Sequence, residues 1–203
     1  MNRGKELAGK VLKLKREIGP IVDTRVAELK ANSDWFSEMC FCLLTANYTA
    51  DGGIRIQKKA GNFSKKSLDE IRVLLKECGH RFPNARAAYI HEGKKHKNQL
   101  ACLSKMANSS ERREWLVKNV KGLGYKEASH FLRNVGYMDV AIIDRHILNI
   151  LAEYGLIKKP KNLNRIRYLK IEKVLENLAK ETKLSQGELD FYLWYMKTGK
   201  VLK

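Results

Sequence analysis

The sequence predicts an all-α protein, and two patterns support that fold class. Apolar residues recur at intervals of three and four along most of the chain, which is the spacing of the buried face of an α-helix. No segment alternates apolar and polar residues between turn signals, as a half-buried strand would. With 203 residues, 44% of them apolar, the chain is long enough to bury a hydrophobic core.

The expected elements of the chain follow from apolar periodicity and from stop signals. A first helix is expected to end at Gly19-Pro20, because proline cannot donate the hydrogen bond of a continuing helix. The next helical pattern runs from about residue 23 to residue 44. Loops are expected at residues 51–53, 92–97 and 158–162, where glycine or charged residues interrupt the pattern.

Two further helix starts have the spacing of a capping box. Ser67 is followed three residues later by Glu70, and Ser185 is followed in the same way by Glu188. In such a box the serine hydroxyl accepts from the glutamate amide, and the glutamate carboxylate accepts from the serine amide. Helices are therefore expected to begin directly after these two serines.

A glycine-punctuated turn joins two helical patterns at about residues 114–136. The first pattern ends at Val120, and the second runs from residue 125 to residue 135. Gly122 and Gly124 let the backbone turn tightly and approach a ligand closely. Free amide groups at the start of the second helix favour an anion such as a DNA phosphate. An ordinary corner between two helices is the alternative.

Two side chains near this turn are suited to chemistry. Lys126 lies in the first turn of the second helix, opposite its apolar stripe, where the helix dipole and nearby cations favour a neutral, nucleophilic amine. Asp144 follows an apolar run and precedes another helical pattern, so it is expected to be an N-cap. A rigid, ionised carboxylate there could face a developing positive charge. A solvated lysine and a purely structural cap are the alternatives.

Composition limits the class of partner. Lysine and arginine total 40 against 22 acidic residues, a formal charge of +18, which favours a polyanion such as nucleic acid. The cysteines, Cys40, Cys42, Cys78 and Cys102, contain no CxxC pair, so we expect reduced, mostly buried thiols and no zinc or iron–sulfur site. No signal peptide or membrane-spanning run is present, and we expect a cytoplasmic protein.

Lys126 after the hairpin, and Asp144 in the sequence Ile143-Asp144-Arg145-His146, resemble the helix-hairpin-helix (HhH-GPD) DNA glycosylase superfamily. The hairpin of that superfamily reads apolar-Pro-Gly-apolar-Gly, and here Lys121 replaces the proline. Over the full chain the sequence is similar to the type 2 branch of 8-oxoguanine DNA glycosylases/AP lyases. The tail, residues 193–203, fits that branch, and no four-cysteine cluster follows Asp144, unlike in the endonuclease III branch.

The resemblance implies roles for individual residues. Lys126 would attack C1′ of the damaged nucleotide, and Asp144 would stabilise the sugar. For base recognition, Trp194 would stack on the flipped base, and the Lys203 carboxylate would accept a hydrogen bond from it. A core tryptophan and a solvated terminus are the alternatives. The resemblance assigns DNA contacts to Asn47, Lys121, Gly122, Gly124 and His146, although Asn47 is also read as an ordinary loop residue. No metal is required, but the carbonyls of Lys118, Val120 and Leu123 would hold a monovalent cation.

The resemblance also implies an architecture and an activity. Residues 34–144 would form a central helical barrel with the hairpin, and residues 1–33 with 145–203 a second lobe, the active-site cleft lying between them. The protein would excise 8-oxoguanine from double-stranded DNA and cleave abasic sites, as a monomer without a redox cofactor. The alternatives are an enzyme for another damaged base and a non-catalytic DNA-binding module.

Overall fold

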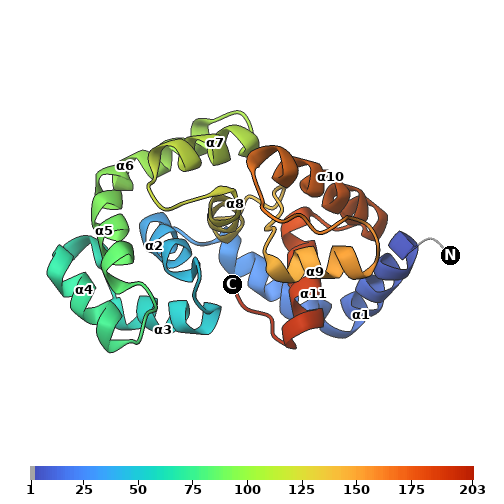
Figure 1. Cartoon of the computed structure of the whole chain (residues 1–203), viewed down its shortest axis with the longest axis horizontal. Helices are drawn as coiled ribbons and strands as arrows, with labels where there is room; N and C mark the ends of the chain where they lie inside the picture. Colours follow the sequence, from blue (N-terminus) through green and yellow to red (C-terminus); the bar gives the residue numbers. More distant parts are fainter. Residues whose placement is uncertain (1–2) are drawn as a thin grey trace. The chain divides into compact units, whose positions relative to one another are not determined.

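The computed structural model describes residues 3–203, and over that range the chain is helical with no strand (Figure 1). The predicted all-α class is therefore confirmed. In chain order the α-helices are α1 (Arg3–Lys30), α2 (Trp35–Thr45), α3 (Ala50–Ala60), α4 (Leu68–Glu77), α5 (Pro83–Gly93), α6 (Lys97–Leu100), α7 (Ser109–Asn119), α8 (Tyr125–Asn134), α9 (Arg145–Glu153), α10 (Arg165–Thr182) and α11 (Gln186–Thr198). Short 3-10 helices are η1 (Phe63–Lys65), η2 (Lys94–His96) and η3 (Ala101–Lys105).

The chain folds into two compact units. One is Asn32–Val135 with α2 to α8, and the other combines the described residues up to Ala31 with Gly136–Lys203. The functional lobes expected at residues 34–144 and 1–33 with 145–203 stay a prediction, and the compact units divide at Val135 instead of Asp144. Residues 136–144 are anchored in the second unit, where the Tyr168 hydroxyl donates to the Ala141 carbonyl at 2.7 Å.

Helix α2 is the centre of the unit Asn32–Val135. It packs against α3, α5 and α8, and nine of its residues are buried, since it is apolar on nearly all sides. Around it, α4 packs against α5 and α7 packs against α8. In the other unit, α1 packs against α10 and α11, and α9 packs against α11. Each unit therefore has its own helical core.

Several predicted helix ends are confirmed. Both capping boxes form. The hydroxyls of Ser67 and Ser185 accept from the backbone amides of Glu70 and Glu188, and the two glutamate carboxylates accept from the backbone amides of the serines. The loop predicted at residues 158–162 lies between α9 and α10. Local side-chain chemistry was sufficient to place these ends.

The predicted stop at Gly19-Pro20 is wrong, because α1 continues to Lys30. A proline inside a helix costs about 3 kcal/mol relative to alanine. Ile18, Val22 and Val26 are buried on either side of this proline, and α1 packs against α10 and α11. Burial of that continuous apolar face outweighs the lost hydrogen bond.

The prediction of one helix over residues 23–44 is also wrong. The segment is divided after α1, and α2 starts at Trp35 because the Asp34 carboxylate accepts from the Ser37 amide at 3.0 Å. A polar cap inside an apolar pattern therefore marks a second helix start.

Two expected loops are helical instead. Residues 51–53 lie inside α3, whose N-cap is Thr49, and residues 92–97 continue from α5 through η2 into α6. The glycines of α3 serve close packing, because a Cβ at Gly52 would lie 2.3 Å from Cε1 of Tyr48. These glycines therefore allow close packing of a helix and do not form a turn.

The buried carboxylate of Glu38 joins the two ends of the unit Asn32–Val135. Its Oε1 accepts from Asn134 Nδ2 at 2.6 Å, and its Oε2 accepts from Asn32 Nδ2 at 3.2 Å. Asn32 Nδ2 also donates to the Asn134 carbonyl at 3.2 Å. The network therefore fixes the points at which the chain enters and leaves this unit.

Replacing Glu38 by alanine removes the acceptor that both amides share. Removing one partner from a buried polar network costs about 3 kcal/mol. We expect Glu38→Ala to lower the free energy of unfolding by about that amount, measured by urea titration with circular dichroism. Glu77→Gln, which removes an exposed carboxylate, should change it by less than about 0.5 kcal/mol. Equal losses in the two variants would contradict the structural role of Glu38.

Candidate active site

The hairpin between α7 and α8 requires glycine at position 122. Gly122 has φ +93°, in the left-handed region that residues with a Cβ rarely adopt. A Cβ there would lie 2.4 Å from Cδ2 of Tyr89 and 3.0 Å from Cδ2 of Leu43. The turn closes through a hydrogen bond from the Leu123 amide to the Val120 carbonyl at 3.1 Å. The predicted helix-hairpin-helix is present, and its backbone packs directly against α5 and α2.

The amino terminus of α8 is suited to an anion. Gly124 is its N-cap and has no side chain to accept from the first amide groups. The positive end of the helix dipole lies at the same place. Lys121 is 64% exposed, and its Nζ lies 3.7 Å from Oε2 of Glu92. These features are compatible with the phosphate contacts predicted for Lys121, Gly122 and Gly124, which stay predictions.

Lys126 is the second residue of α8, and most of its side chain is covered. The side chain is 25% exposed, and Nζ lies 3.6 Å from Oε1 of Glu127, which is 18% exposed. The sequence predicts a lysine on the solvent side of the helix, so this degree of cover differs from the expectation. Glu127 was missed as well, because successive residues of a helix do not normally face each other.

Asp144 is the N-cap of α9, as predicted. Its Oδ1 accepts from the His146 amide at 2.8 Å and from the Ile147 amide at 2.9 Å. Both bonds end on the same oxygen, so Oδ2 takes no part in the cap. The Ile143 amide donates to the Tyr168 hydroxyl at 3.3 Å, which holds the segment before the cap. The carboxylate is therefore rigid, and its catalytic role stays a prediction.

The structure brings two other predicted site residues together in the same unit as Asp144. The rings of His146 and Trp194 pack edge to face, with centroids 5.0 Å apart and planes at 81°. Trp194 is half-buried, and its Nε1 is buried with no hydrogen-bond partner. Lys203 is partly exposed at the end of the irregular segment after α11. The predicted roles of these three residues in DNA and base recognition are not tested by their positions.

Asn47 lies in the loop between α2 and α3 and is exposed. Its φ is +61°, a left-handed conformation that asparagine adopts more readily than most residues. The flanking backbone is braced, because Arg86 Nη2 donates to the Ala46 carbonyl at 3.0 Å and the Tyr48 hydroxyl donates to the Cys78 carbonyl at 3.2 Å. An exposed amide on a braced loop is compatible with the predicted DNA contact, which stays a prediction.

Comparisons with known proteins show the family of the chain. A family model described as 8-oxoguanine DNA glycosylase (Ogg-HhH) matches residues 22–184. The 8-oxoguanine DNA glycosylase/AP lyase of Methanocaldococcus jannaschii is 51% identical, over 97% of this chain and 99% of that protein. The chain belongs to the 8-oxoguanine DNA glycosylase family.

Solved structures of this glycosylase family share the fold over nearly the whole chain. The crystal structure of the Methanocaldococcus jannaschii 8-oxoguanine glycosylase/lyase in complex with a 15mer DNA containing 8-oxoguanine has a TM-score of 0.94 at 50% identity, covering 98% of this chain and 100% of that one. The 8-oxoguanine DNA glycosylase of Thermotoga maritima has a TM-score of 0.93 at 42% identity, with coverages of 98% and 100%.

The described residues of this glycosylase contain no group of three His, Cys, Asp or Glu side chains that could hold a metal ion. The four cysteines form no disulfide, and only Cys40 and Cys42 are buried, whereas Cys102 is exposed. Burial raises the pKa of the Cys40 thiol well above its usual range. Within residues 3–203, no helix combines the length and the apolar character needed to cross a bilayer.

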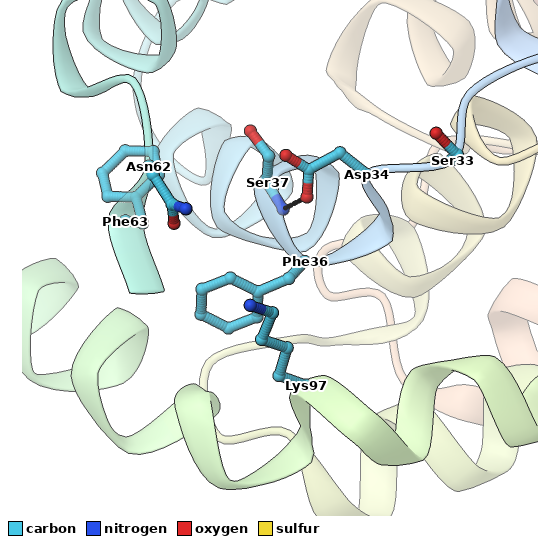
Figure 2. Close-up of a pocket in the computed structure, with 7 residues that line it drawn as sticks. All are labelled: Ser33, Asp34, Phe36, Ser37, Asn62, Phe63 and Lys97. Atoms are coloured by element: carbon cyan, nitrogen blue, oxygen red, sulfur yellow. Dashed lines mark hydrogen bonds between the residues drawn. The ribbon is translucent and has the colours of Figure 1, made fainter. Parts of the chain in front are cut away.

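A polar cavity of about 280 Å³ lies elsewhere in the unit Asn32–Val135 (Figure 2). Its lining residues are Ser33, Asp34, Phe36, Ser37, Asn62, Phe63 and Lys97. None of the predicted site residues is among them. The Asp34 carboxylate there is occupied as the cap of α2, and Lys97 Nζ donates to the Ser64 hydroxyl at 3.2 Å. Nothing connects this cavity with the glycosylase chemistry.

Gly122→Ala tests the hairpin packing. Both the left-handed backbone and the contact with Tyr89 oppose a Cβ, so we expect a loss of at least about 2 kcal/mol in urea unfolding, and weaker DNA binding. Gly79→Ala is the matched control, because Gly79, which follows the end of α4 in the left-handed conformation, has φ +68° but open space around the position of a Cβ. It should cost only about 1 kcal/mol of backbone strain. Equal losses would mean that the close contact of Gly122 is unimportant.

Proposed function

We propose that this chain excises 8-oxoguanine from duplex DNA and then cleaves the resulting abasic site, as a bifunctional DNA glycosylase/AP lyase. The observation that carries this proposal is the full-length likeness, at 51% identity, to a protein named for both activities. The DNA bound in the crystal structure of a relative contains the same damaged base. The chain has 40 basic and 22 acidic residues, and this excess of positive charge favours binding to DNA.

The damaged base is inaccessible inside the stacked duplex, so its nucleotide is rotated out before reaction. The Lys126 amine then attacks C1′, the bond to the base breaks, and its electron pair leaves with the base. Loss of protons and ring opening give an imine between Lys126 and the sugar. The imine permits β-elimination of the 3′ phosphate, which breaks the strand.

Asp144 stabilises the positive charge that develops on the sugar. Its support is the cap geometry, in which two backbone amides hold Oδ1 and keep the carboxylate oriented. A preorganised carboxylate needs no rearrangement when the charge appears.

The remaining predicted residues bind DNA and the flipped base. Trp194 stacks on the base, supported by its half-buried ring against His146, and the partly exposed Lys203 contributes to base recognition. The hairpin residues, Asn47 and His146 contact the duplex, and hairpin carbonyls bind a monovalent cation. The enzyme works as a monomer in the cytoplasm, with neither a redox cofactor nor an iron–sulfur cluster.

Borohydride trapping tests the nucleophile. Reduction of the imine should cross-link the wild-type protein to duplex DNA containing 8-oxoguanine, and Lys126→Gln should give no covalent complex because it lacks the amine. Lys121→Gln is the matched control, since it removes an exposed hairpin lysine and should still cross-link at saturating DNA. Trapping of Lys126→Gln at the wild-type level would remove Lys126 from the mechanism.

Asp144→Asn tests the negative charge of Asp144 separately from its role as the N-cap of α9. Asparagine is as good an N-cap as aspartate, so stability should change by less than about 0.5 kcal/mol. Single-turnover release of 8-oxoguanine should fall by at least about a hundredfold, because the negative charge is lost. Unchanged release would assign Asp144 a structural role alone.

A further inference from the structure

The carboxylate of Glu127 lies between the hairpin and the amine of Lys126. Its Oε1 is 3.6 Å from Lys126 Nζ, and its Oε2 would lie 3.3 Å from a Cβ placed on Gly124. Both side chains of the ion pair are mostly covered, at 25% and 18% exposure. By contrast, the Lys59–Glu77 pair in the same unit is 54% and 57% exposed. The first turn of α8 thus contains a shielded ion pair.

We propose that Glu127 is a positioning residue for Lys126, which sets the place and orientation of the amine before DNA binds. The inference rests on the proposed role of Lys126 as nucleophile. A lysine amine ends a long stem with several rotatable bonds, so a fixed partner reduces the positions that it samples. A displacement of about 1 Å in a reacting group can cost on the order of a hundredfold in rate.

The location of Glu127 favours a fixed position for its own carboxylate. As the third residue of α8 it lies at the positive end of the helix dipole, which attracts a carboxylate. Gly124 has no side chain, so the carboxylate can fold back against the hairpin. Solvent screens a covered pair less than an exposed one. The amine is therefore held by a group that is itself held by the helix end.

The test is the rate of imine formation at saturating enzyme, measured by borohydride trapping on two duplexes. One duplex contains 8-oxoguanine and the other a preformed abasic site. We expect Glu127→Gln to trap both at least about tenfold more slowly, with a dissociation constant for DNA, from fluorescence anisotropy, that is unchanged within about twofold. Glu77→Gln makes the same change in net charge at an exposed pair and should trap at the wild-type rate.

Three outcomes would overturn the inference. The first is a wild-type trapping rate for Glu127→Gln on abasic DNA. The second is slow trapping on the 8-oxoguanine duplex alone, because Glu127 would then act on the base and not on the amine. The third is an equal loss in Glu77→Gln.

If Glu127→Gln does not fold, as judged by circular dichroism, Glu127→Asp replaces it. Aspartate keeps the charge but withdraws the carboxylate by one methylene, so slower trapping supports the inference and the wild-type rate overturns it. Failure of the proposed function is distinguishable, because the wild type would then form no cross-link with 8-oxoguanine DNA, or Lys126→Gln would cross-link, whatever the Glu127 variants do.

Discussion

The carboxylate of Glu38 fixes one end of α8, and the glycine hairpin fixes the other. At the carboxyl end of α8, the Asn134 side chain donates a hydrogen bond to the buried Glu38 carboxylate, which belongs to α2. At the amino end, Gly122 places the hairpin backbone against Tyr89 and Leu43, where a side chain would not fit. With both ends of the helix held, the remaining freedom of the proposed nucleophile is in the side chain of Lys126. The contact with Glu127 restricts that freedom.

Asp144 is held by different means in the other unit. Its cap bonds use one carboxylate oxygen, and the preceding segment is fixed by Tyr168, whose hydroxyl both donates to the Ala141 carbonyl and accepts from the Ile143 amide. A buried phenol with two backbone partners is a rigid support. The two predicted catalytic groups therefore differ, since one is a flexible amine with a carboxylate partner and the other is a carboxylate locked to the backbone.

Most features that depend on local chemistry could be predicted from the sequence, although the cap of α2 by Asp34 is local and was missed. The hairpin, the Asp144 cap and both capping boxes are set by residues within a few positions of each other. Features that depend on distant packing could not. Pro20 reads as a stop because the apolar face buried against α10 and α11 is invisible in the local pattern. Gly52 reads as a turn because its crowding by the ring of Tyr48 exists only once α3 has formed.

The candidate site follows the same rule. Residue types and spacing indicated Lys126 and Asp144, but the sequence did not reveal how far Lys126 is covered or that Glu127 faces it. Both depend on side-chain conformations around the hairpin. For Trp194, the sequence left a core position and a base-stacking position open, and the structure gives a half-buried ring against His146.

The cover over Lys126 has a consequence for chemical selectivity. Cells contain small free aldehydes that condense with accessible amines. Lys121 and Lys126 each face a carboxylate, but Lys121 is 64% exposed and open to such compounds, whereas Lys126 is only 25% exposed. An aldehyde that diffuses alone reacts first with the exposed amines of the surface. A nucleotide on a bound DNA strand is brought to the amine by the binding energy of the duplex, so the cover over Lys126 favours substrates delivered by DNA over small molecules that diffuse alone.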